Sequence, residues 1–200
     1  MNPDEPFRTI CIAGAFLIVP FMLYHRLRAH VPGEKLDRWQ EGKLILFTLR
    51  PVALAFGAMF IGFMISPPSV RWAALPVAAW VRWIGVGMAV SAGLVLAWAV
   101  PALGRNLTDT VVTRAAATLV TSGPYRWVRH PFYVAVALAV LGNSLAAANW
   151  FMLVTGTGVI GLLALRTPRE EARLIEKFGD AYRAYARHTG RFLPRRRDRS

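Results

Sequence analysis

The residues best suited to chemistry lie in three polar segments of the C-terminal half of the chain. These segments are residues 103–106, 119–133 and 166–171. They contain arginine, histidine, tyrosine and glutamate side chains, which bind charged groups and exchange protons. We therefore expect the functional site where the three segments meet.

The middle segment offers contacts to several kinds of chemical group. Gly123-Pro124 predicts a turn with little side-chain bulk, which lets a ligand approach the backbone closely. Its cationic side chains can hold an anionic group, and its aromatic rings can contact a cation or a flat ring. The residues that can hold an anionic group are Arg126, Arg129 and His130, and the rings belong to Tyr125, Trp127 and Tyr133.

The third segment adds two carboxylates, Glu170 and Glu171, which can bind an ammonium group or ribose hydroxyls. Together the segments suit a ligand with a flat base, a carboxylate and a positive centre, and S-adenosylmethionine has all three. The same residue types also suit an aromatic and basic belt at a membrane surface, so composition alone leaves both interpretations open.

The distribution of charge and hydropathy indicates an integral membrane protein. The chain has 200 residues, 55% of them hydrophobic, and the apolar residues form long blocks with charges in the gaps between them. The net charge of +13 falls in alternate loops and in the tail, which favours a membrane over nucleic acid as its explanation. Cys11 is the only cysteine, so an intrachain disulfide is excluded, and we expect no metal site and no nucleic-acid partner.

The apolar blocks predict an all-α, polytopic membrane protein with about five transmembrane helices. Pro131 opens a block too long for one span, and polar residues near its middle predict a tight helical hairpin, with a single kinked helix as the alternative. An amphipathic helix is predicted over residues 168–187. The five spans are predicted at residues 8–24, 44–65, 81–100, 132–145 and 150–165.

The hairpin brings the polar segments together, because an antiparallel pair of helices returns the chain to the side where it began. His130 and Arg166 should therefore lie near each other. We expect one membrane domain, with three N-terminal spans in residues 1–100, the cofactor-binding half in 101–194 and a basic tail in 195–200.

Lysine and arginine counts predict the orientation of the chain in the cell membrane. The loops after the first and third spans and the C-terminal region hold most of the cations, whereas the opposite side has only Arg8, Arg71 and Arg82. We expect the N-terminus outside and the C-terminus, with the polar segments, in the cytoplasm.

The run GPYRWVRHPFY, an apolar hairpin and the following RTPREEARLIEKFGDAYRAYARHTGRFLP resemble the isoprenylcysteine carboxyl methyltransferase family, and more broadly the membrane methyltransferases that include phospholipid N-methyltransferases. The likeness covers roughly residues 103–194. It implies S-adenosylmethionine as the methyl donor, in a cytoplasm-facing pocket of the C-terminal half, and a substrate that enters from the bilayer.

The resemblance also implies roles for individual residues. Arg166 and Glu171 would act at the reacting end as catalytic residues. The residues expected to bind the cofactor are Val120, Gly123, Pro124, Tyr125, Arg129, His130, Tyr133 and Glu170.

Two positions depart from the family pattern. Ala117 stands where the family usually has histidine, and Ala135 stands where it has glycine. The acceptor stays open among carboxylates, thiols and amines on lipophilic or small molecules. Two alternatives also remain: a steroid-reductase-like membrane enzyme that uses NADPH, and a non-catalytic accessory protein.

Overall fold

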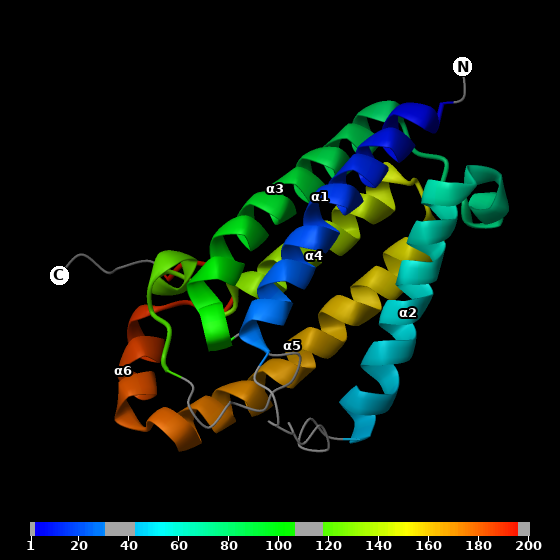
Figure 1. The fold of residues 1–200 in the computed structure, drawn as a ribbon. Helices are drawn as coiled ribbons and strands as arrows, with labels where there is room; N and C mark the ends of the chain where they lie inside the picture. The colour runs from blue at the N-terminus through cyan, green and yellow to red at the C-terminus, as the bar shows by residue number, and fades with distance from the viewer. Residues whose placement is uncertain (1–2, 31–42, 107–117, 196–200) are drawn as a thin grey trace.

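The protein is a bundle of long helices (Figure 1). The structure, a computed structural model, describes residues 3–30, 43–106 and 118–195. Within these ranges the α-helices are α1 (Glu5–Ala29), α2 (Lys43–Ile65), α3 (Ala79–Leu103), α4 (Pro131–Ala146), α5 (Trp150–Phe178) and α6 (Asp180–His188). Short 3-10 helices are η2 (Pro67–Ala73), η3 (Gly104–Asn106) and η4 (Gly123–Arg126).

The all-helical, polytopic membrane architecture is confirmed. In the part of the chain that the structure describes, four helices are long and apolar enough to cross a membrane, namely α1, residues Phe47–Ile65 of α2, α3 and α5, and α4 is a shorter apolar helix. Large apolar side chains such as Phe16, Leu54 and Leu94 are about 70% exposed on the surface of the bundle. A bilayer accounts for this exposure, because lipid solvates apolar side chains and helices satisfy their own backbone hydrogen bonds.

Helix α3 packs against α1 and α4, and α5 packs against both α4 and α2 (Figure 1). The contact between α3 and α4 is close because both helices present glycine. A Cβ atom at Gly85 would lie 2.6 Å from the Gly142 carbonyl oxygen, and one at Gly142 would lie 2.7 Å from the Gly85 oxygen. Small residues at such crossings let two backbones approach within a membrane.

The predicted hairpin is confirmed as α4, a short turn and α5. Ser144 and Asn143 donate to backbone carbonyls one turn back, at Val140 and Ala139, so α4 accommodates both polar residues within one continuous helix. Asn149 caps α5 by accepting a hydrogen bond of 2.9 Å from the Met152 amide. The alternative of one long kinked helix is therefore wrong.

The prediction of one separate amphipathic helix over residues 168–187 is wrong, because α5 runs through Pro168 to Phe178 and α6 begins at Asp180. Its buried residues keep one helical face on both sides of the proline, from Met152 and Val159 to Thr167 and Glu171. Packing along this face outweighs the single backbone hydrogen bond that proline removes. The helix ends instead at Gly179, whose φ of 55° suits a residue without a Cβ atom.

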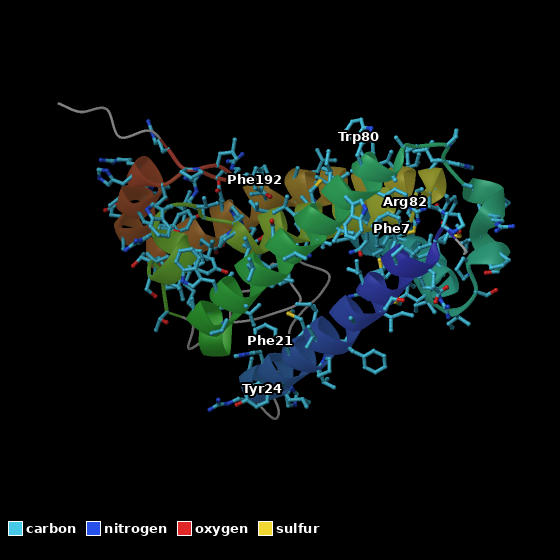
Figure 2. The ribbon with its side chains drawn as sticks, turned by 90° about the horizontal axis from the view of Figure 1, so that it is seen from above. Phe7, Phe21, Tyr24, Trp80, Arg82 and Phe192 are labelled. Carbon is cyan, nitrogen blue, oxygen red and sulfur yellow. The ribbon has the colours of Figure 1, made fainter. Side chains whose placement is uncertain are left out.

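The two ends of the bundle differ in their polar contacts. At the end that holds the N-terminus, Arg82 donates to Asp4 and to the Ala146 carbonyl, both at 2.9 Å, and lies over the Phe7 ring. Figure 2 shows Arg82 and Phe7 together at the start of α1, and Tyr24 at its far end. The chemistry-bearing residues gather at this far end, where α1 and α3 end and α4 begins.

Candidate functional site

A cavity of about 490 Å³, here called the site cavity, opens at the start of α4. The helices α1, α3, α4 and α5 and the turn η4 all contribute to its wall. Its lining residues are Met22, Leu23, Arg26, Leu103, Asn106, Tyr125, Arg129, His130, Phe132, Tyr133, Leu163, Arg166 and Glu170. The three polar segments that the sequence singled out therefore do meet, and the wall combines cationic, acidic, aromatic and aliphatic groups.

Six of the ten site residues expected from the sequence line this cavity. They are Tyr125, Arg129, His130, Tyr133, Arg166 and Glu170. The other four are Val120, Gly123, Pro124 and Glu171, which are not among the lining residues. Ala117 lies outside the described residues.

Gly123 and Pro124 support the cavity from behind, because η4 packs against α3. A Cβ atom at Gly123 would lie 3.2 Å from the Ala102 Cβ, and the φ of Gly123 is 59°. Pro124 and Tyr125 are buried, and the Tyr185 hydroxyl donates to the Tyr125 carbonyl oxygen at 2.6 Å. This turn fixes where the Tyr125 ring enters the wall.

The Glu171 carboxylate lies within hydrogen-bond distance of two arginines and one histidine. Oε1 lies 2.9 Å from Arg129 Nε and 3.2 Å from His130 Nε2, and Oε2 lies 2.6 Å from an Arg191 guanidinium nitrogen. Glu171 is 9% exposed, so these contacts offset the cost of burying its charge. The carboxylate therefore orients Arg129 and His130 while standing behind the wall that they form.

The neighbouring Glu170 faces the cavity and accepts a hydrogen bond of 2.5 Å from the Tyr133 hydroxyl. The rings of His130 and Tyr133 stack at 5.4 Å between centroids, with 13° between their planes. Arg166 is 6% exposed and lines the same cavity. One wall thus presents a carboxylate, a guanidinium and two parallel rings.

Residues 189–191, which follow α6, lie along residues 127–130 and hold them in place. The Arg129 and His130 amides donate to the carbonyls of Gly190 and Arg191, at 2.8 Å and 3.1 Å. The Arg129 guanidinium also donates to the Ala186 carbonyl and closely contacts the Thr189 carbonyl. A Cβ atom at Gly190 would collide with the Leu193 carbonyl oxygen, so the turn that follows requires glycine.

Sequence reasoning missed the contribution of α1 to the wall. Arg26 entered only the count of loop charges, and Met22 and Leu23 belong to an apolar span. A local signal could not reveal them, because they reach the cavity only through the packing of α1 on α3. Asn106 was within the first polar segment, and its amide joins that segment to Thr118 at 3.1 Å and 3.3 Å.

Burial and neighbouring charges shift several pKa values around the site. Burial raises the pKa of Tyr185 to about 12, although the charge of Arg129 opposes the shift. Burial likewise raises the pKa of Tyr125 and of Tyr182 above the usual range. The hydrogen bond to Glu171 raises the pKa of Arg191, so this residue stays a cation.

The fold and the site define an all-helical, multi-span membrane protein with a polar cavity at one end of its bundle. Residues 84–176 match the family model of the isoprenylcysteine carboxyl methyltransferase (ICMT) family. The resemblance to this family is thereby confirmed over that part of the chain.

The chain is also similar to individual proteins over part of its length. The chain is 41% identical over 81 residues to the cobalt-zinc-cadmium resistance protein CzcN of Cupriavidus metallidurans, covering 39% of this chain and 36% of that protein. It is 30% identical over 129 residues to the protein-S-isoprenylcysteine O-methyltransferase of Mus musculus, covering 63% and 46%. The chain thus spans less than half the length of either relative.

The fold also resembles a solved structure, that of the eukaryotic intramembrane Ras methyltransferase ICMT. The TM-score is 0.57 at 18% sequence identity, and the match covers 97% of this chain and 68% of the other. At this identity the likeness concerns the fold.

Proposed function

We propose that this protein is an integral membrane methyltransferase that uses S-adenosylmethionine to methylate a carboxylate, thiol or amine on a lipophilic or small acceptor. The observation that carries the proposal is the site cavity, where Arg129, His130, Arg166 and Glu170 meet aromatic and aliphatic walls. The similarity to protein-S-isoprenylcysteine O-methyltransferases supports the same reaction type.

The lining residues fit the proposed cofactor in size and in chemistry. A volume of about 490 Å³ lies in the range of small-molecule sites. Arg129, His130 and Arg166 would hold the carboxylate, and Glu170 would bind the ammonium group or the ribose hydroxyls. Rings of Tyr125 and Tyr133 would contact the flat base. When bound, S-adenosylmethionine supplies an electrophilic methyl group on a sulfonium centre.

The protein's part in the reaction would be to orient the reactants and exclude water. Arg166 lines the site cavity and is 6% exposed, and a cation held in place by burial can align an anionic group. Glu170 could accept the proton of an amine acceptor, whereas a carboxylate or thiolate needs no base. Glu171 would act as a positioning residue, because its carboxylate holds Arg129 and His130.

The acceptor would approach along the apolar part of the wall. Met22, Leu23 and Leu163 line the cavity from α1 and α5, two helices that present apolar surface to the bilayer. A lipophilic acceptor would make apolar contacts with this wall. The exclusion of water there would strengthen the electrostatic contacts on the polar side of the cavity. In the proposed orientation the N-terminus lies outside the cell, and the site cavity and C-terminus face the cytoplasm.

Calorimetric titration of the detergent-purified chain with S-adenosylmethionine tests the proposal. The expected result is saturable binding that His130→Gln weakens by more than about tenfold, since a charge-assisted contact contributes about 1.5–3 kcal/mol. His188→Gln is the matched control, because His188 is an exposed histidine outside the site cavity. Binding of NADPH in place of S-adenosylmethionine would instead support the reductase alternative, and binding of neither would support an accessory protein.

A further inference from the structure

We propose that Arg126, His188 and Arg195, beside the Trp127 indole, form a site for the phosphate of an anionic phospholipid headgroup. The site is a second cavity of about 380 Å³, here called the arginine cavity, lined by Arg126, Trp127, His188, Pro194 and Arg195. None of these residues lines the site cavity. Arg126 follows Tyr125 in the same turn, yet the two residues line different cavities.

The positive charge of the arginine cavity favours the binding of an anion. Arg126 lies 3.7 Å above the centre of the Trp127 ring, and the Arg195 guanidinium donates to the Arg187 carbonyl at 2.9 Å. Within the described residues, neither arginine forms an ion pair with a carboxylate, and no acidic residue lines the cavity. Guanidinium groups whose charge is not neutralised favour phosphate, which accepts their planar hydrogen bonds in pairs.

The position of the arginine cavity favours a lipid as the source of that phosphate. Trp127 packs edge to face on Trp98 of α3, at 5.2 Å between ring centroids, and both indoles are more than a third exposed. Trp98 lies five residues, or about 7 Å, before the end of α3. Exposed tryptophans at this depth mark the membrane–water interface, where headgroup phosphates lie.

The other end of the bundle supports this placement. Trp72, Trp80 and Trp83 are exposed there, and Trp72 contacts Trp150 at 5.8 Å. The molecule therefore has an aromatic group at each end of its spans, as expected when both interfaces of a bilayer are contacted. The arginine cavity lies at the interface on the side of the site cavity, within reach of lipids of one leaflet.

Lipid titration of the full chain in a non-ionic detergent, followed by native mass spectrometry, tests the proposal. The probe is a short-chain phosphatidylglycerol, and the compared protein is the double variant Arg126→Gln/Arg195→Gln. We expect the variant to bind this lipid roughly tenfold or more weakly, since each interfacial arginine contributes severalfold to the affinity for anionic lipid. Unfolding midpoints without lipid, equal in both proteins, would show that the variant is folded.

The matched control is Arg183→Gln/Arg187→Gln, which removes the same charge from α6 but leaves the lining of the arginine cavity intact. We expect this control to bind within about twofold of the unmodified chain. An equal loss in both double variants would overturn the proposal in favour of diffuse attraction. Short-chain phosphatidylcholine or inorganic phosphate binding as tightly as phosphatidylglycerol would overturn the assignment to an anionic lipid.

Discussion

The Glu171 carboxylate on α5 binds the Arg191 guanidinium at 2.6 Å, which joins the membrane bundle to the segment that follows α6. Arg129 and His130 bind the other oxygen of the same carboxylate. One side chain thus connects residues 127–130 and residues 189–191, which lie along each other, to α5, the helix that carries Arg166.

Replacing Glu171 with glutamine should destabilise the protein and weaken ligand binding together. The neutral amide leaves the Arg129 and Arg191 guanidinium groups without their shared counter-charge, which we expect to cost about 2–3 kcal/mol. A lower unfolding midpoint and a weaker affinity for S-adenosylmethionine, both measured in detergent, would check this. Glu176→Gln, an exposed change on the same helix, should alter neither quantity. Unchanged binding in Glu171→Gln would contradict the positioning role.

Replacing Arg166 with alanine should lower the turnover rate strongly while changing the stability of the fold much less. Removal of a fixed cation at the reacting end typically costs about 100-fold in rate, and Arg166→Lys should retain part of the activity because it keeps the charge. Methyl transfer from radiolabelled S-adenosylmethionine to membrane extracts is the measurement. Arg169→Gln, on the exposed face of α5, serves as the control. If Arg166→Ala turns over as fast as the unmodified chain, the assignment is wrong.

The close crossing of α3 and α4 predicts opposite effects for two neighbouring glycines. Gly85→Ala should destabilise the fold by about 1–3 kcal/mol, because its Cβ would press on the α4 backbone. Gly87→Ala should be neutral or slightly stabilising, because a Cβ there meets nothing within 4 Å. Unfolding midpoints of the two variants, measured side by side, test the packing, and equal midpoints would contradict it.

The turn after α6 should depend on Gly190 in the same way. A methyl group there would collide with the Leu193 carbonyl and displace the segment whose carbonyls bind the Arg129 and His130 amides. We expect Gly190→Ala to weaken S-adenosylmethionine binding about as much as the replacement of a residue that lines the site cavity, such as His130→Gln. Gly161→Ala, where a Cβ meets open space, should bind normally. Normal binding by both variants would show that the segment does not hold the site.

Stability should fall when the buried tyrosines ionise. The pKa of Tyr185 is raised from 10.0 to about 12 in the folded protein, so its contribution is complete below pH 10 and is lost as the pH rises to about 12. Tyr185→Phe should cost about 1 kcal/mol near neutral pH, by removing the hydrogen bond to the Tyr125 carbonyl, and should reduce this alkaline loss. Unfolding midpoints from pH 8 to 12 measure both effects. A variant with an undiminished alkaline loss would contradict the assignment to Tyr185.

The sequence by itself determined the membrane architecture and the approximate place of the site. Long blocks of apolar residues can cross a bilayer as helices of sufficient length, because a helix satisfies its own backbone hydrogen bonds. The spans and the hairpin therefore follow from local composition. The hairpin in turn brings His130 and Arg166 to one end of the bundle, because two antiparallel helices return the chain to its starting side. Both residues line the site cavity.

Only the tertiary structure decided what individual side chains do there. The sequence predicts a span over residues 150–165 and a separate helix over 168–187, but burial of Thr167 and Glu171 on the face of α5 continues one helix to Phe178. Adjacent residues also have different surroundings: Tyr125 enters the site cavity and Arg126 the arginine cavity, while Glu170 faces the site cavity and Glu171 stands behind it. The physical reason is that these differences depend on contacts between segments far apart in the chain, such as Glu171 with Arg129, and local patterns of hydropathy and charge carry no signal for such contacts.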